Sequence, residues 1–497
     1  NFIKSEYWNE DFFYFSKKYC VMKKLGYGFL LLSLAVLIIL MLNTSTFESK
    51  QITVDQVTIE IPESPENNLA EAIKFKTVSY EDTSKLDTAE FHSFHKFLKS
   101  AYPLIDSLIP MEKVNESLLY KWDGTNKALN PIILMSHQDV VPVDENTLDQ
   151  WEVDPFKGEI KDGMVWGRGA MDDKVSLIAI MEAVEFLISK GFEPARTIYM
   201  AFGHDEEVGG PKGAGEIAKL LQSRGVKAEL VIDEGGYVVD KLMSGIDKSL
   251  ALINVAEKGF VSFKITVNTS GGHSSSPPVD NTIGLLTRAI NRLEENQFEY
   301  KLVEPINSQM KYMGPELPFL QKVVFANPWL FGGTVAKAMN AHTTTAPTII
   351  QGGMKANVIP TTAWAIMNFR ILPGENIELI HEHVVNIIND DRFTIEIDGS
   401  AKNPSPVSTI ESPAFELIAK TIKQSLGETI VAPGLLGGGT DATHFYSITN
   451  NVYRFLPMRI NPENLTGFHG INESITIDNY HEIVRFFVQL IRNCNEL

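Results

Sequence analysis

The stretch IILMSHQDVVPVD, residues 132–144, is the part of the sequence that most strongly indicates the fold. It begins with a short apolar run typical of a buried strand, and His137 and Asp139 follow where that run ends. An imidazole at such a place can bind a metal ion through one ring nitrogen, while a carboxylate two residues later fixes the tautomer through the other. If this pair is considered alone, a hydrogen-bonded structural histidine is the commoner interpretation of His137. The neighbouring segments are therefore needed to distinguish it from a metal ligand.

Strands and helices alternate on both sides of this stretch. The residue pattern predicts strands at 133–136, 197–204 and 228–236. It predicts helices at 68–73, 89–100, 176–188 and 215–224. This alternation is typical of an α/β fold, a mainly parallel sheet with helices on both faces. In such sheets ligands bind beyond the carboxyl ends of the strands, which is where His137 and Asp139 stand.

The pattern changes near Lys258. Alternating strands at 260–270, 363–372 and 393–399 are interleaved with helices at 282–293 and 377–388. This order is typical of a ferredoxin-like α+β module. It is predicted to be an insertion, because the helix at 411–425 and the final segments return to the earlier alternation.

Four parts of the chain follow from these patterns. We expect an N-terminal segment at 1–53, a catalytic domain whose two parts are 54–257 and 400–497, and an inserted lid or dimerisation-type domain at 258–399. Residues 299–345 are rich in Pro, Phe and Met and fit no element; a lid extension and an interface element are both open.

Composition limits the classes of function. The 497 residues with 44% hydrophobic content can bury a large core in two domains, or in one with an insertion. The formal net charge of −18 argues against nucleic acid as a partner. Cys20 and Cys494 stand near opposite ends and provide neither a disulfide framework nor a thiolate metal site. A metal ion would therefore be held by histidines and carboxylates.

The N-terminal segment contains a candidate targeting or membrane-anchoring sequence. Residues 25–42 carry no charge, Lys23 and Lys24 precede them, and a polar tripeptide follows. The run fits a membrane anchor or the core of a signal peptide. No clear small-x-small cleavage site follows, which favours an uncleaved single-pass anchor with the catalytic domain on the non-cytoplasmic side. If the segment is cleaved, the protein is secreted or periplasmic.

Two further motifs place carboxylates at loop ends. WGRGAMDDK puts Asp172 at a glycine-rich turn before a helix, where it can bridge two cations or, in the simpler interpretation, cap the helix. GHDEEVGG puts Glu206 and Glu207 at the end of a strand. Their side chains point in different directions, so one can bind a metal ion while the other faces a bound water. An acidic turn is the simpler alternative.

Two more motifs complete the set. VIDEGG offers Asp233 or Glu234 at the next strand end, and FHGINES offers His469, for which an isolated histidine is the alternative. Each motif is weak by itself. Together, in this order and all at loop ends, they indicate a binuclear metal site.

The chain from about residue 54 to its C-terminus resembles the co-catalytic zinc exopeptidases that include aminoacylase, carboxypeptidase G and carboxypeptidase S. The resemblance rests on GRGAMDDK, FGHDEEVGG, LLQSRGV followed by VIDEGG, AEKG, SGGHSSSPP and GGTDATHF. Within this family it is most similar to carboxypeptidase S and to the secreted N-fatty-acyl amino acid synthase/hydrolase.

The resemblance implies two zinc ions as cofactors. His137 and Asp233 would hold one, Glu207 and His469 the other, and Asp172 would bridge them. Family members differ over whether the acid of the third motif is Asp or Glu, and Asp233 is preferred here over Glu234.

The resemblance also implies the remaining site residues. Asp139 would orient His137, Glu206 would be the general base, and His273 would stabilise the oxyanion. The residues expected to bind the free carboxylate of the substrate are Arg370, Asn357, Gly438, Gly439 and Thr440. From pattern alone, an ion-paired surface arginine is an equally good interpretation of Arg370, and a polar loop residue is the better one for His273.

The resulting hypothesis is a zinc amidohydrolase that cleaves the amide bond next to a free C-terminal amino acid of a small peptide. The alternative substrate is an N-acyl amino acid, hydrolysed or synthesised. A non-catalytic binding ectodomain is the remaining alternative, although every expected ligand is present. The resemblance also makes a homodimer a candidate assembly, because in dimeric relatives the histidine matching His273 reaches the neighbouring subunit's site.

Overall fold

A computed structural model describes residues 7–240, 248–461 and 464–497. Its largest part is a ten-stranded sheet with the order β1-β2-β6-β3-β7-β17-β9-β8-β18, and β16 pairs with β9. The strands are β1 (Met111–Val114), β2 (Ser117–Trp122), β3 (Ile132–His137), β6 (Ile198–Gly203), β7 (Leu230–Asp233), β8 (Val238–Val239), β9 (Ser249–Glu257), β16 (Thr429–Leu436), β17 (Val452–Arg454) and β18 (Arg459–Ile460).

The centre of this sheet is parallel. β3 pairs in parallel with β6 and β7, and β17 pairs in parallel with β7, whereas β1 and β2 form an antiparallel edge. Every residue of β3, β6 and β7 is buried, as expected for strands covered on both faces. The helices around the sheet are α2 (Glu66–Ile73), α3 (Thr88–Ala101), α4 (Pro103–Leu108), α5 (Lys174–Ser189), α6 (Ala214–Ser223), α12 (Pro413–Leu426) and α13 (Ile477–Asn493).

Successive residues of β3 pack into two different cores. Ile132 and Leu134 join a cluster that includes α5 and α13, while Ile133 and Met135 join a cluster that includes α6. The side chains of a strand alternate between the faces of a sheet, so helices lie on both sides of this one. The predicted α/β class is confirmed, and the predicted helices differ from α2, α3, α5 and α6 by at most two residues at either end.

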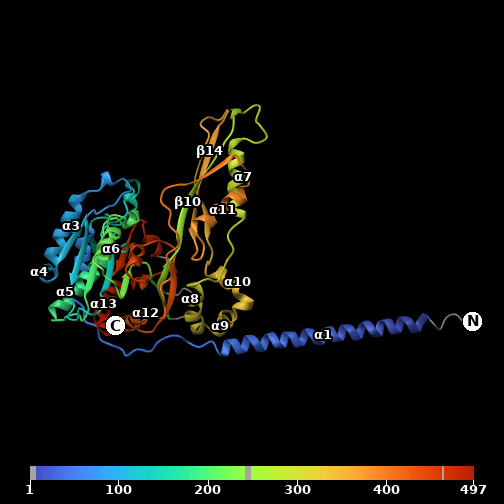
Figure 1. Cartoon of the computed structure of the whole chain (residues 1–497), viewed down its shortest axis with the longest axis horizontal. Helices are drawn as coiled ribbons and strands as arrows, with labels where there is room; N and C mark the ends of the chain where they lie inside the picture. The colour runs from blue at the N-terminus through green and yellow to red at the C-terminus, as the bar shows by residue number, and fades with distance from the viewer. Residues whose placement is uncertain (1–6, 241–247, 462–463) are drawn as a thin grey trace, which may run out of the picture.

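A second, four-stranded antiparallel sheet has the order β12-β14-β10-β15. Together with its two helices it forms what we call the inserted module, which has its own apolar core. Its elements are β10 (Gly259–Asn268), α7 (Thr282–Glu295), β12 (Thr344–Gly352), β14 (Thr362–Ile371), α11 (Ile377–Ile388) and β15 (Phe393–Ile397). The module stands beside the large sheet (Figure 1). Its topology is ferredoxin-like, as predicted.

Several elements were not anticipated from the sequence. The unplaced segment forms three helices, α8 (Ile306–Met313), α9 (Phe319–Ala326) and α10 (Pro328–Ala338), followed by the edge strand β12. Short strands complete two small sheets: β4 (Glu159–Lys161), β5 (Met164–Trp166) and β19 (Ser474–Thr476) form one, and β11 (Gly272–His273) and β13 (Val358–Ile359) the other.

The N-terminal helix α1 (Tyr7–Ser45) projects away from the rest of the molecule (Figure 1). Its part Met22–Ser45 is long and apolar enough to cross a membrane. At its C-terminal end α1 lies beside α9, which contacts it. The apolar helix fits either a membrane anchor or a signal sequence.

Candidate active site

The metal-ligand candidates lie together because three of their motifs follow neighbouring parallel strands. His137 ends β3, Glu206 follows β6, and Glu234 follows β7. β3 pairs with both other strands, so their carboxyl ends meet at one edge of the sheet. The turn before α5 adds Asp172, and the loop before β19 adds His469.

Two groups of potential ligand atoms share Asp172. His137, Asp172 and Glu234 form one, and Asp172, Glu207 and His469 form the other. Asp172 Oδ1 lies 3.0 Å from His137 Nε2, and Asp172 Oδ2 lies 3.0 Å from His469 Nε2. A carboxylate that offers one oxygen to each of two histidines is arranged to bridge two cations. Asp172 is not the N-cap residue of α5: that position belongs to Asp173, whose side chain makes no capping hydrogen bond to the helix backbone.

In the third motif the structure brings Glu234, and not the expected Asp233, close to His137. Glu234 Oε1 lies 3.4 Å from His137 Nε2, whereas Asp233 is not part of either group. Asp233 Oδ2 instead accepts a hydrogen bond from the Ala442 backbone N–H at 2.8 Å. Asp233 is the last residue of β7, and neighbouring side chains on an extended backbone point in opposite directions. Only one of the two can therefore face His137.

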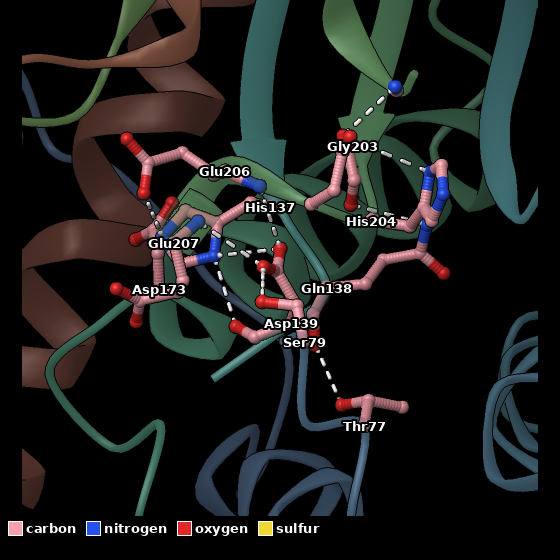
Figure 2. A network of polar contacts seen from close by, with 12 residues as sticks. Thr77, Ser79, His137, Gln138, Asp139, Asp173, Gly203, His204, Glu206 and Glu207 are labelled. Carbon is pink, nitrogen blue, oxygen red and sulfur yellow. Dashed lines mark hydrogen bonds and ion pairs between the residues drawn. The ribbon is translucent and has the colours of Figure 1, made fainter. Parts of the chain in front are cut away.

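The His137 ring is held in a defined orientation. Its Nδ1 lies 2.9 Å from the Asp139 backbone oxygen and 3.4 Å from Asp139 Oδ1. A carbonyl oxygen only accepts, so Nδ1 carries a proton and Nε2 faces the carboxylates. The Asp139 carboxylate also accepts hydrogen bonds from Ser79 Oγ at 2.5 Å and from the backbone N–H groups of Glu206 and Glu207 (Figure 2). Asp139 thus positions both the His137 ring and the backbone of the motif that contains Glu206 and Glu207.

The electrostatics of the cluster favour a bound cation. Burial alone would lower the pKa of His137, but hydrogen bonds to Asp139, Asp172 and Glu234 raise it well above 6.5. Hydrogen bonds to Asp172 and Glu207 raise the pKa of His469 to about 10. Burial raises the pKa of Glu234 well above its usual value. Without a metal ion, protons therefore compensate the buried carboxylates.

The donor set fits a metal ion of the zinc type. Among the described residues, buried Glu207 Oε1 has no hydrogen-bond partner, although its other oxygen lies 3.3 Å from His469 Nε2. An unsatisfied buried carboxylate oxygen is costly unless a cation occupies the space beside it. Imidazole and carboxylate ligands without thiolate are a usual set for catalytic zinc.

Glu206 lies at the edge of the same cluster. It begins a short 3-10 turn, Glu206–Val208, and its Oε2 lies 4.0 Å from His137 Nε2. Burial raises the pKa of Glu206 well above the usual range, and nearby Glu234 adds to that effect. A carboxyl group with a raised pKa can both accept and return a proton near neutral pH.

Glu473 is a structural residue that sequence reasoning did not identify. It is fully buried, accepts a hydrogen bond from Arg168 Nη1 at 2.6 Å and also accepts from the backbone N–H groups of Gly169, Met171 and Asp172. Arg168 in turn donates to the backbone oxygen of His469. This ion pair ties the turn bearing Asp172 to the loop bearing His469. Both residues stand inside motifs quoted above, GRGAMDDK and FHGINES.

The glycine-rich motif with Gly438, Gly439 and Thr440 follows β16. Thr440 Oγ1 donates to Glu257 Oε1 at 2.7 Å, and Glu257 also accepts from Arg454 Nε at 2.8 Å. The side chain of Thr440 is therefore committed to a buried ionic network. Gly438 and Gly439 retain some exposure and can present their backbone outward.

The candidates in the inserted module lie at opposite ends of it. Arg370 is exposed and pairs with Phe260, at the end of β14 where β10 begins. His273 and Asn357 belong to the segments at the other end, where the His273 ring contacts Ser275 and the Asn357 backbone oxygen accepts from Ser274. Nine residue steps along β14 correspond to about 30 Å. One module therefore does not bring Arg370 and His273 together.

Comparisons with known proteins agree with one another. The model of "Peptidase family M20/M25/M40" matches residues 133–493. A probable carboxypeptidase S-like 2 of Dictyostelium discoideum is 38% identical over 93% of this chain and 92% of its own length. The N-fatty-acyl-amino acid synthase/hydrolase PM20D1 of Mus musculus is 37% identical over 85% of this chain and 86% of its length. The M20 family metallo-carboxypeptidase Sso-CP2 from Sulfolobus solfataricus shares the fold, with a TM-score of 0.66 at 18% identity over 88% of this chain and 100% of that one.

Proposed function

Because this chain belongs to peptidase family M20/M25/M40, we propose that it is a two-zinc amidohydrolase that releases a C-terminal amino acid. Membership makes it a metal-dependent enzyme acting on amide bonds, so the non-catalytic alternative is set aside. The observation that carries the two-ion proposal is Asp172, whose two oxygens each lie 3.0 Å from a different histidine.

We assign five side chains to the two ions. His137 and Glu234 would hold one, Glu207 and His469 the other, and Asp172 would bridge them. Bound zinc would polarise a carbonyl oxygen and lower the pKa of an attacking water towards neutrality. The assignment rests on the distances between the ligand atoms and on the unsatisfied oxygen of Glu207.

Glu206 would move the proton. It would accept a proton from the attacking water and transfer it to the leaving amide nitrogen, for which its raised pKa is suited. Asp139 would keep His137 and the backbone of Glu206 in place during this step. Arg370 would bind the free carboxylate of the substrate, aided by the backbone of residues 438–440. Asn357 lies beside His273 at the other end of the module, so it could aid this binding only from a second copy of the chain.

We further propose that the enzyme works as a homodimer. His273 and Arg370 lie at opposite ends of the inserted module, about 30 Å apart by strand length. A second copy of the chain could supply His273 to the site served by Arg370, where it would stabilise the oxyanion. The membrane assignment is part of the same proposal: α1 would anchor the chain with residues after 45 on the non-cytoplasmic side.

N-acyl amino acid hydrolysis or synthesis is the second candidate, favoured by the 37% identity to the PM20D1 relative. The test uses the full chain in detergent with its metal counted, assayed on a blocked dipeptide and on an N-oleoyl amino acid, with and without chelator. Chelator-sensitive turnover with about two zinc ions per chain supports the proposal, and the preferred substrate selects the activity. One ion per chain at full activity would contradict the binuclear site.

A further inference from the structure

Helices α9 and α10 expose large apolar side chains beside the end of α1. Phe319 and Leu320 in α9 are 57% and 79% exposed, and Trp329 and Leu330 in α10 are 54% and 49% exposed. We call these four residues the α9–α10 face. Residues 318–320 and 328–330 contain no charged side chain. Large apolar side chains that stay exposed on neighbouring helices are candidates for contact with another apolar phase.

Hydrogen bonds tie the junction between α9 and α10 to α1. Buried Asn327 donates from Nδ2 to the Leu40 backbone oxygen at 3.3 Å and accepts from Asn43 Nδ2 at 2.9 Å. Val36, Leu40, Asn43 and Thr44 are the less exposed residues of this part of α1 and form one helical face. Helices α9 and α10 are therefore held beside the last turns of α1 (Figure 1).

The attachment continues beyond the helix. Phe47 packs near Gly314, and the Gln51 side chain both accepts from the Val431 backbone N–H and donates to the Val431 backbone oxygen, each at 2.9 Å. Val431 belongs to β16 of the large sheet. The segment after α1 is thus fixed to the body of the protein, so the direction of α1 sets how the body faces a membrane.

The length of α1 places this contact at the membrane surface. The 24 residues Met22–Ser45 rise about 36 Å as a helix, whereas the hydrocarbon core of a bilayer is about 30 Å thick. The last residues of α1 therefore emerge at the interface, and helices that contact Leu40 and Asn43 lie at the same depth. Trp329 fits this place, because its Nε1 donates to Asn327 Oδ1 at 3.2 Å while the ring stays exposed.

We propose that the α9–α10 face docks into the non-cytoplasmic leaflet of the bilayer that α1 spans. The partner is the lipid bilayer itself, and the docked face holds the base of the inserted module against the membrane. The proposal goes beyond the catalytic function and rests on α1 acting as a membrane anchor. A second copy of the chain covering the same face is the competing occupant, and the test below separates the two.

The test attaches an environment-sensitive fluorophore to single cysteines of the full chain in phosphatidylcholine nanodiscs, each disc holding one chain. Cys20 is replaced by serine, and Cys494 is kept because it is fully buried. The label is placed by Leu320→Cys in the face, by Leu34→Cys inside α1 and by Leu108→Cys in α4. Leu108 is a matched leucine, 63% exposed, at the end of α4, a helix that lies on the side of the molecule away from α1 (Figure 1).

Lipids carrying a nitroxide on the upper acyl chain, which reports on position 320, or near the end of the acyl chain, which reports on position 34, are then added as quenchers. We expect loss of fluorescence at positions 34 and 320 and none at 108. Quenching at 34 without quenching at 320 would overturn docking. A parallel set of discs that hold two chains tests the competing occupant: protection at 320 seen only in that set would assign the face to a second copy. No quenching at 34 would remove the membrane anchor and the docking with it. Because the readout is independent of turnover, the catalytic proposal stands or falls separately.

Discussion

The carboxyl edge of the large sheet and the inserted module differ in how far apart they place their candidate functional residues. At the sheet edge, neighbouring parallel strands end together, so His137, Glu206 and Glu234 meet although they are far apart in sequence. In the module, antiparallel β10 and β14 run side by side over ten residue pairs, and Arg370 and His273 stand near opposite ends. Parallel strands therefore bring the proposed catalytic residues together, whereas the module places the proposed substrate contacts near its two ends.

The largest expected loss of activity follows from removing the proposed proton carrier, Glu206, at the carboxyl edge of the large sheet. Glu206→Gln keeps the shape of the side chain but removes its basicity, so we expect kcat to fall by about 10²–10⁴-fold. Metal content should stay unchanged, because Glu206 belongs to neither ligand group. Metal analysis and steady-state kinetics on one preparation measure both. Retained activity in this variant would remove Glu206 from the mechanism.

Neighbouring residues of the third motif should differ sharply in metal binding. Glu234→Gln removes a proposed ligand and should cost more than the roughly 10–100-fold in metal affinity that is typical of an outer partner. Asp233→Asn keeps a group that can accept from Ala442 and should cost less. Competition with a chromogenic chelator ranks the two variants. A larger loss for Asp233→Asn would restore the assignment made from sequence.

The distance between Arg370 and His273 in the inserted module predicts complementation between two impaired variants. Arg370→Ala should mainly raise KM for substrates with a free carboxylate, and His273→Ala should mainly lower kcat. If a site combines Arg370 of one subunit with His273 of the other, mixed dimers contain one intact site. Mixing the two variants under subunit exchange should therefore recover part of the activity. Simple averaging of the two separate activities would show that each chain works alone.

Metal binding should depend on pH with a defined sign. Without metal, the raised pKa values of His137, His469 and Glu234 mean that folding takes up protons, so these groups stabilise the apo protein more at low pH and less as pH rises through their folded pKa values. Zinc needs the same groups deprotonated. The gap in Tm between zinc-loaded and apo protein should widen from about pH 5.5 to about pH 8. Calorimetry in buffers of different ionisation enthalpy should also detect proton release; a pH-independent gap would contradict the cluster as described.

Sequence reasoning succeeded where a local pattern determines position. Each ligand motif directly follows an apolar strand or a glycine-rich turn, and strand ends of a parallel sheet share one edge, so the order of motifs predicted their meeting. The choice between Asp233 and Glu234 depends on where β7 ends, which a pattern locates only to within a few residues. The pairing of Arg168 with Glu473 spans 305 residues and leaves no local signal.

The segment that the sequence left unplaced, residues 299–345, and the strand β12 at its end were harder to interpret for a physical reason. β12 contains Pro347 and a register shift between Pro347 and Ile349, and it is an exposed edge strand, so it lacks the alternation of a half-buried strand. The apolar residues of α9 and α10 follow no core-facing period because some of them stay exposed. The membrane contact that we propose for them depends on α1, which lies beside α9 and has no counterpart in the local pattern.

The smallest expected effect concerns the α9–α10 face, which belongs neither to the carboxyl edge of the large sheet nor to the inserted module. The double variant Leu320→Ser/Trp329→Ser removes exposed apolar groups, so we expect stability within about 0.5 kcal/mol of the parent. Turnover of a soluble blocked dipeptide should be unchanged because the metal cluster is untouched. Turnover of an N-oleoyl amino acid dissolved in the same nanodiscs should fall if docking aligns the module with the bilayer. Leu108→Ser is the matched control, and equal loss on both substrates would place the effect in the fold instead of at the membrane.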